Sequence, residues 1–241
     1  MANPVMNAFD ESIALEGKPM TINGTVNKSF LLFGILLLTA CYSWGLIAAG
    51  LTDKASMLMG AGSIIGFILA LIICFTRKAL HILTPIYAAC EGLLLGGVSA
   101  VYNGEYSGIV FQAIIVTIIT LASMLIMYKS KMIQATPTFK KVIFTATLSV
   151  ALIYLIQFIA SFFGRGIPQI FTNSNIGILF SVIVSLIAAF NLIVDFDFIE
   201  KGEANLLPEK YEWYGAFGLM VTLVWLYLEI LRLLAKSRSR N

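Results

Sequence analysis

The chain has 241 residues, of which 59% are hydrophobic and 12% are charged, and its formal net charge is +3 at pH 7. This composition excludes an ordinary soluble globular domain, in which about a quarter of the residues are charged. The small net charge gives no reason to expect nucleic acid as a partner. Because long apolar runs recur along the chain, we predict an integral membrane protein whose surroundings are the lipid bilayer.

The N-terminal segment 1–29 is polar and contains acidic and basic residues in similar numbers. It holds no short apolar core followed by a small-residue cleavage site, so no secretory signal peptide is predicted. We expect the first membrane helix to serve as the insertion signal.

Seven apolar runs follow this segment. An α-helix needs about 20 apolar residues to cross about 30 Å of hydrocarbon. The runs that reach this length are 30–50, 55–75, 79–102, 108–128, 142–163, 176–194 and 213–234. Their connections are short, which favours antiparallel neighbours. We therefore predict an all-α membrane protein, a polytopic bundle of seven transmembrane helices in one domain at 30–234, followed by a basic C-terminal tail at 235–241.

The Lys and Arg residues of the loops predict the orientation of the bundle. With a cytoplasmic N-terminus, 10 of the 16 basic residues lie on the cytoplasmic side, including four lysines between the fourth and fifth runs. We predict this orientation. Four of the other six basic residues lie at the C-terminal end, which the same rule would also place in the cytoplasm. A re-entrant run with both chain ends in the cytoplasm therefore stays open as an alternative.

Small residues four apart occur in the second and third runs. Such spacing lets the backbones of two membrane helices approach closely. We interpret these residues as helix contact faces rather than as a pore lining; they are Gly62, Gly66 and Ala70 in the second run, and Ala88, Gly92, Gly96 and Ala100 in the third.

Polar residues form one stripe along the seventh run. The residues Gly215, Gly218, Thr222, Trp225, Glu229 and Arg232 follow one another in steps of three and four, whereas Leu223 and Ile230 lie on another face. A stripe this polar is expected to face the bundle interior, which would make the last helix central, and Leu223 and Ile230 are expected to face lipid. A simple i, i+3 pairing of Glu229 with Arg232 near the membrane boundary is an open alternative for those two residues.

Two further ionisable residues lie at membrane depth and are functional candidates for that reason. Glu91 lies near the middle of the third run, and Asp195 lies where the sixth run ends. Asn191 is four residues before Asp195 and shares its face, whereas Asp197 lies on the opposite face. We expect Asp197, with Glu200, Glu203, Glu209 and Glu212, to belong to a solvated acidic loop.

Sequence motifs of enzymes are missing from the chain. It contains no HExxH, no GxSxG, no glycine-rich phosphate loop and no cluster of Cys and His. We predict a protein that is not an enzyme and holds no cofactor. Membrane carboxylates without such motifs indicate the handling of ions or protons.

Several segments together resemble a known family. They are Glu91-Gly92 in the third run, Asp195-Phe196-Asp197-Phe198-Ile199-Glu200 at the end of the sixth, and the segments 212–218 and 225–234. With the seven runs, they resemble the bacterial Bax inhibitor-1 family, also called the YccA-like or transmembrane BAX inhibitor motif family. The resemblance covers the chain from about residue 23 and is strongest in its last 50 residues.

The resemblance implies a seven-helix fold with the last helix at the centre and a pH-sensitive calcium leak. In the family, the leak is controlled by two aspartates on the last two helices, which share a proton and can latch onto an arginine. Asp195 matches the first aspartate, but Thr222 stands where typical members have the second. Two close carboxylates in a low dielectric cannot both stay ionised, so raising the pH would open their contact. In this chain, Glu91 or Glu229 would have to complete the pair.

Our leading hypothesis is therefore an ion channel of the bacterial inner membrane, a passive Ca2+ leak gated by protonation of Asp195. Glu91, Glu229, Arg232, Asn191 and Thr222 are the other candidate gating residues, and Asp195 and Glu91 are candidates for transient contacts with Ca2+. One alternative is a non-conducting interaction protein that binds a membrane partner such as a protease. Another is a secondary transporter of a small solute, which is less favoured because no internal repeat is found.

The orientation can be tested with topology reporters. A reporter inserted near Gln134, in the lysine-rich connection, is expected to behave as cytoplasmic, and one near Gly104 as external. The opposite result at both positions would invert the predicted topology.

Overall fold

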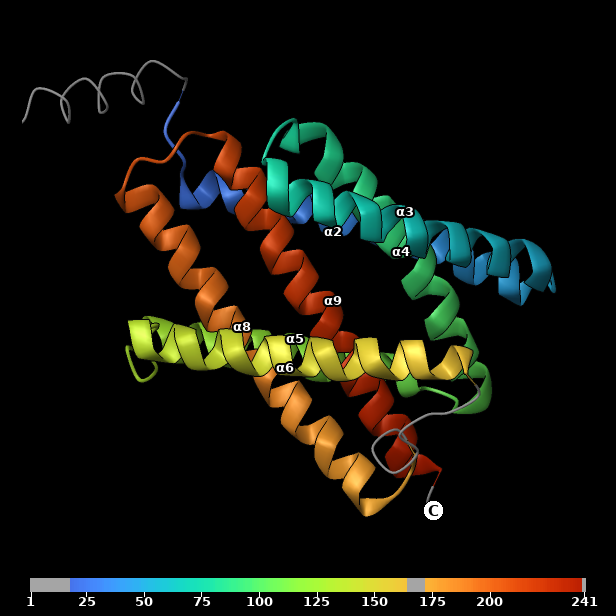
Figure 1. Ribbon diagram of the computed structural model, residues 1–241. Helices are drawn as coiled ribbons and strands as arrows, with labels where there is room; N and C mark the ends of the chain where they lie inside the picture. The colour runs from blue at the N-terminus through green and yellow to red at the C-terminus, as the bar shows by residue number, and fades with distance from the viewer. Residues whose placement is uncertain (1–17, 164–171, 240–241) are drawn as a thin grey trace, which may run out of the picture. The chain divides into compact units, whose positions relative to one another are not determined.

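The computed structural model describes residues 18–163 and 172–239, and within these ranges it contains seven long helices and no strand (Figure 1). An isolated bridge pairs Pro19 with Pro208. All seven helices are long and apolar enough to cross a membrane, which confirms the predicted fold class of an integral all-α membrane protein. They are α2 (Ile22–Ala48), α3 (Thr52–Thr76), α4 (Leu80–Glu105), α5 (Ile109–Lys129), α6 (Pro137–Phe162), α8 (Asn175–Ala204) and α9 (Lys210–Arg238).

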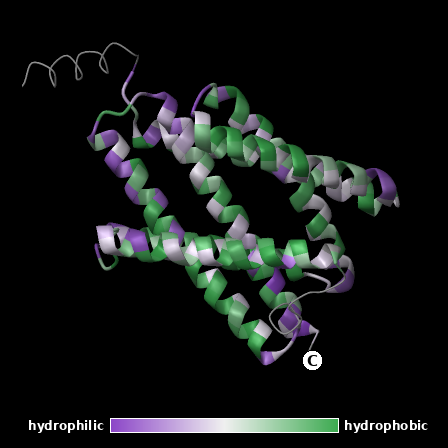
Figure 2. Ribbon diagram, viewed as in Figure 1, coloured by the Kyte–Doolittle hydropathy of each residue, from purple (hydrophilic) through white to green (hydrophobic). Residues whose placement is uncertain are grey.

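The helices extend beyond the apolar runs into polar flanks. Figure 2 shows hydrophobic residues along most of each helix and hydrophilic residues gathered toward the helix ends. α2 begins at Ile22, where the Thr21 side chain accepts a hydrogen bond from the Gly24 N–H at 2.9 Å. α8 ends at Ala204 and not at 194. Hydropathy reports which residues suit lipid, whereas the helical hydrogen-bond ladder continues past that boundary.

The described residues form two compact units. The first contains residues 18–100 and 197–220, and the second contains 101–163, 172–196 and 221–239. α8 and α9 therefore contribute a part of their length to each unit.

Close contacts at glycines hold α2, α3 and α4 together in the first unit. A Cβ at Gly96 would collide with the Ala40 carbonyl of α2, and one at Gly92 with the Leu36 carbonyl. A Cβ at Gly62 of α3 would lie 2.9 Å from the carbonyl oxygen of Cys90. The interpretation of the small residues as helix contact faces is thus confirmed for these glycines.

A polar cluster joins the start of α2 to the start of α9 in the same unit. Glu212 accepts hydrogen bonds from the Thr21 N–H at 2.8 Å and from the Thr21 hydroxyl at 2.9 Å, and it also pairs with Lys28. Glu203 accepts a hydrogen bond from the Ile22 N–H at 2.9 Å. Carboxylates at a helix N-terminus satisfy its unpaired N–H groups and stabilise its dipole.

The expectation of a solvated acidic loop is wrong for most of its members. Asp197, Glu200 and Glu203 lie within α8, and Glu212 lies in the first turn of α9. Asp197 is 6% exposed and pairs with Lys201 at 2.9 Å, and Glu212 is 4% exposed. These two carboxylates are buried because basic and polar partners compensate their loss of water.

The expected contrast between two faces of α9 is also wrong. Leu223 and Ile230, which were expected to face lipid, are 8% and 5% exposed, and Thr222 and Glu229 on the polar stripe are buried as well. In the apolar part of α9, 56% of the residues are buried, which is a larger share than in the other six helices of the described ranges. Neighbouring elements thus cover α9 on more than the polar side, while its central place in the bundle stays a prediction.

The glycine contacts predict an asymmetric effect of methyl groups. Gly96→Ala forces the backbones of α2 and α4 apart and is expected to lower the free energy of unfolding by about 1–3 kcal/mol. Gly34→Ala in α2 is the matched control, since no atom lies within 4 Å of the added Cβ. It is expected to be neutral, or to stabilise the helix by less than about 1 kcal/mol. Unfolding in mixed detergent micelles measures both, and equal effects would contradict this packing.

Candidate functional site

Asp195 lies well inside α8, not at its end, and its carboxyl group meets α9. A side-chain hydrogen bond joins it to Thr222. The second carboxyl oxygen, Oδ2, is shielded from solvent and has no hydrogen-bond partner among the described residues. The chain therefore places a neutral hydroxyl, and not a second carboxylate, against Asp195.

Asn191 lies one turn before Asp195, but it contacts α6. Its amide nitrogen donates hydrogen bonds to the Thr147 hydroxyl and to the Ile187 carbonyl, both at 2.9 Å. The expected shared face of Asn191 and Asp195 thus divides between two neighbours, and Asn191 ties α8 to α6.

Glu229 and Arg232 form a triad with Tyr154 of α6. The Tyr154 hydroxyl donates a hydrogen bond to Glu229 Oε1 at 2.7 Å. Arg232 Nη1 donates to the same carboxylate oxygen at 2.9 Å and to the Tyr154 hydroxyl at 2.7 Å. The guanidinium carbon also lies 5.3 Å from the centroid of the Tyr154 ring. The i, i+3 pairing of Glu229 with Arg232 is therefore confirmed, and α6 takes part in it.

Sequence analysis missed the residues of α6. Thr147 and Tyr154 are seven residues apart, so they lie on one face of the helix two turns from each other. One binds Asn191 and the other binds Glu229. This spacing of two polar residues in an apolar run was the available signal.

The two acidic residues named as partners for Asp195 have other contacts. Glu91 accepts a hydrogen bond from the Tyr87 hydroxyl at 2.7 Å and belongs to the first unit, so its pairing with Asp195 stays a prediction. Glu229 follows Thr222 by seven residues, or about 10 Å along the helix axis. Its carboxylate is engaged with Arg232 and Tyr154 instead.

The described residues contain no group of three or more His, Cys, Asp and Glu that could hold a metal ion. Tight Ca2+ sites in proteins use six to eight oxygen ligands. Asp195 offers a single carboxylate beside one hydroxyl, which is fewer oxygen ligands than such a site uses.

The triad predicts a specific loss on removing one hydroxyl. Tyr154→Phe keeps the ring over Arg232 but deprives a buried carboxylate of a donor, so it is expected to lower the free energy of unfolding by about 2 kcal/mol. Tyr42→Phe is the control, because the Tyr42 side chain is 52% exposed. The same detergent unfolding measurement applies. A Tyr154→Phe protein as stable as the control would show that the triad contributes nothing to the fold.

Comparison of the chain with known proteins finds a family match. A family model described as Bax inhibitor 1 like matches residues 3–239. No curated protein and no solved structure matches the chain. The matched range includes all seven apolar helices, and with them the Asp195 segment of α8 and the whole of α9. The chain therefore belongs to the Bax inhibitor 1 like family.

Proposed function

We propose that this protein is a passive, pH-sensitive path for Ca2+ across the bacterial cytoplasmic membrane, with its N-terminus in the cytoplasm. Asp195 is the proton-sensitive residue, and Thr222 is its hydrogen-bond partner. No enzymatic step and no resident cofactor belong to this function. The choice of Ca2+ and of a response to pH is based on the family resemblance. The choice of Asp195 as the sensitive residue is based on the geometry around it.

The observation that carries the proposal is that Asp195 has a shielded carboxyl oxygen without a partner and, unlike Glu229, forms no ion pair among the described residues. Thr222 satisfies one side of the group, while Oδ2 is shielded and has no partner among the described residues. A carboxylate at membrane depth is costly, and an oxygen without a donor adds to that cost. A proton on Asp195 removes the negative charge of the carboxylate, and a cation beside Asp195 compensates that charge. Either one lowers the cost of burying the group.

The sign of the pH response follows from this argument. With its proton, Asp195 is neutral and its burial beside Thr222 costs least. Without the proton, the charged group favours water or Ca2+ beside it, which separates α8 from α9 locally. Flux should therefore rise as the pH rises, and a single titrating carboxylate should spread the rise over about two pH units.

Glu229 and Arg232 receive a different role in this proposal. Arg232 is held by the Glu229 carboxylate and the Tyr154 hydroxyl. Because Arg232 Nη1 already has these partners, we assign the triad to joining α6 with α9. Asn191 likewise joins α6 with α8. The gate itself then consists of Asp195 and Thr222.

Calcium flux into proteoliposomes as a function of pH tests the proposal. Asp195→Asn keeps the shape of the side chain and removes its charge, so flux is expected to stay low and to lose most of its pH dependence. Glu200→Gln is the matched control on the same helix, because Glu200 is exposed, whereas Asp197 is buried and paired with Lys201.

A folded Asp195→Asn protein that conducts with the wild-type pH profile would exclude Asp195 as the gate. A wild-type protein that shows no calcium flux at any pH would favour the non-conducting interaction protein, with a membrane protein such as a protease as its partner.

A further inference from the structure

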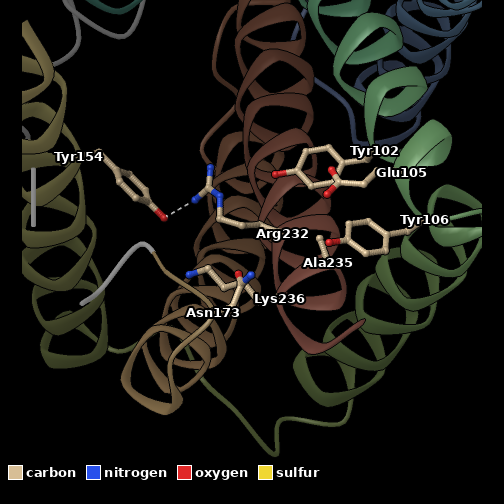
Figure 3. Close-up of a pocket in the computed structure, with 8 residues that line it drawn as sticks. All are labelled: Tyr102, Glu105, Tyr106, Tyr154, Asn173, Arg232, Ala235 and Lys236. Carbon is tan, nitrogen blue, oxygen red and sulfur yellow. Dashed lines mark hydrogen bonds between the residues drawn. The ribbon is translucent and has the colours of Figure 1, made fainter. Parts of the chain in front are cut away.

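A polar cavity of about 360 Å³ lies at the C-terminal end of α9, in the second unit. This volume falls within the range of small-molecule sites. Two cationic side chains, one carboxylate, three tyrosines and an asparagine supply all but one of its lining residues. They are Tyr102, Glu105, Tyr106, Tyr154, Asn173, Arg232, Ala235 and Lys236 (Figure 3).

The cavity lies where three helices end. α4 ends at Glu105, α8 begins at Asn175 and α9 ends at Arg238. In a chain of seven spans, the end of the third, the start of the sixth and the end of the seventh lie on one side of the membrane. Arg238 ties this region together by donating to the Ser107 carbonyl and to Gln112 Oε1, both at 2.8 Å. We infer from this arrangement that the cavity lies at the depth of the lipid headgroups.

Cationic nitrogens are fixed on one side of the cavity. Lys236 is 4% exposed, and its ammonium group donates to the Gly177 carbonyl at 3.0 Å and to the Ser181 hydroxyl at 2.9 Å. Arg232 is fixed by Tyr154 and Glu229. In Figure 3 the Arg232 head lies toward Tyr154, and the Glu105 carboxylate lies on the other side of Arg232, beside Tyr102. The cavity thus has a basic side and an acidic side.

We propose that this cavity binds a phosphate ester that carries a primary ammonium group, the chemistry of the phosphatidylethanolamine headgroup. Arg232, through the guanidinium N–H groups other than those of Nη1, and Lys236 bind the phosphate oxygens by charge-assisted hydrogen bonds, and the Tyr102 hydroxyl and the Asn173 amide add neutral donors. Glu105 binds the ammonium group. A quaternary amine has no N–H to donate to Glu105, and a glycerol headgroup has no positive charge. The binding site is separate from Asp195 and does not depend on the proposed calcium path.

Native mass spectrometry of the delipidated full-length protein tests this site. The probes are dioleoyl phosphatidylethanolamine, phosphatidylcholine and phosphatidylglycerol, each added at the same molar ratio. Wild-type protein is expected to retain phosphatidylethanolamine about threefold better than the other two, since an exposed carboxylate gives a modest preference. Glu105→Gln is expected to abolish the advantage over phosphatidylglycerol. Asp53→Asn, an exposed carboxylate in α3 that does not line the cavity, is expected to keep it.

A second arm separates a lipid from a soluble ligand. Free O-phosphoethanolamine that displaces the lipid at millimolar concentration would identify a soluble ester as the occupant, and failure to displace it would identify the lipid.

Lys236→Met, checked for folding by its thermal stability, is expected to weaken retention of all three lipids. Equal retention of the three lipids by wild-type protein would overturn the proposal. An unchanged preference in Glu105→Gln, whose exposed side chain leaves folding intact, would do the same.

Discussion

A carboxylate that leaves water loses its favourable hydration free energy. This loss determines how the polar residues of α8 and α9 are arranged. An ionised group without water costs several kcal/mol unless hydrogen bonds or opposite charges replace the lost hydration. Asp197 has Lys201, Glu212 has Lys28 and Thr21, and Glu229 has Arg232 and Tyr154. Asp195 has the hydroxyl of Thr222 and an oxygen with no partner in the described part of the chain. Glu229 Oε2 also has no partner in the described part of the chain. Among these four acids, however, Asp195 is the one that forms no ion pair with a described residue.

This difference separates the structural acids from the candidate gate. Glu229 has a buried oxygen, Oε2, without a partner among the described residues, but its Oε1 accepts hydrogen bonds from a cation and a phenol, so its charge is opposed by Arg232. Glu212 anchors the start of α2 by the same means. A carboxylate that faces a cation gains less from a proton than a carboxylate without such a partner. The two aspartates that the family resemblance implies would weaken compensation through like charges, whereas Asp195 of this chain has one hydroxyl beside it.

The sequence was sufficient to predict the membrane class, the number of spans and the family. The reason is that the length of an apolar run and the cost of burying charge depend on local composition. The glycine contacts of α4 could also be predicted, since their spacing of four is a property of one helix.

The long-range contacts could not be predicted from the sequence. Tyr154 is a single aromatic residue in an apolar run, and its partner Glu229 is 75 residues away. The burial of Leu223 and Ile230 depends on neighbours of α9 that no periodicity within α9 reveals. The acidic segment after Asp195 was misjudged because its charges suggested water, whereas basic and polar partners from distant parts of the chain allow it to be buried.

The most direct test of the account is the pH dependence of calcium flux through Thr222→Asp protein in proteoliposomes. This change places a second carboxylate where Thr222 now binds Asp195, and so restores the pair that typical family members have. Two adjacent carboxylates hold a shared proton to higher pH than one carboxylate beside a hydroxyl. The account predicts that the rise in flux moves to higher pH by about one unit or more. Thr222→Ser, which keeps the hydroxyl, should conduct like the wild type. A Thr222→Asp protein with the wild-type profile would contradict the claim that Thr222 and Asp195 together form the gate.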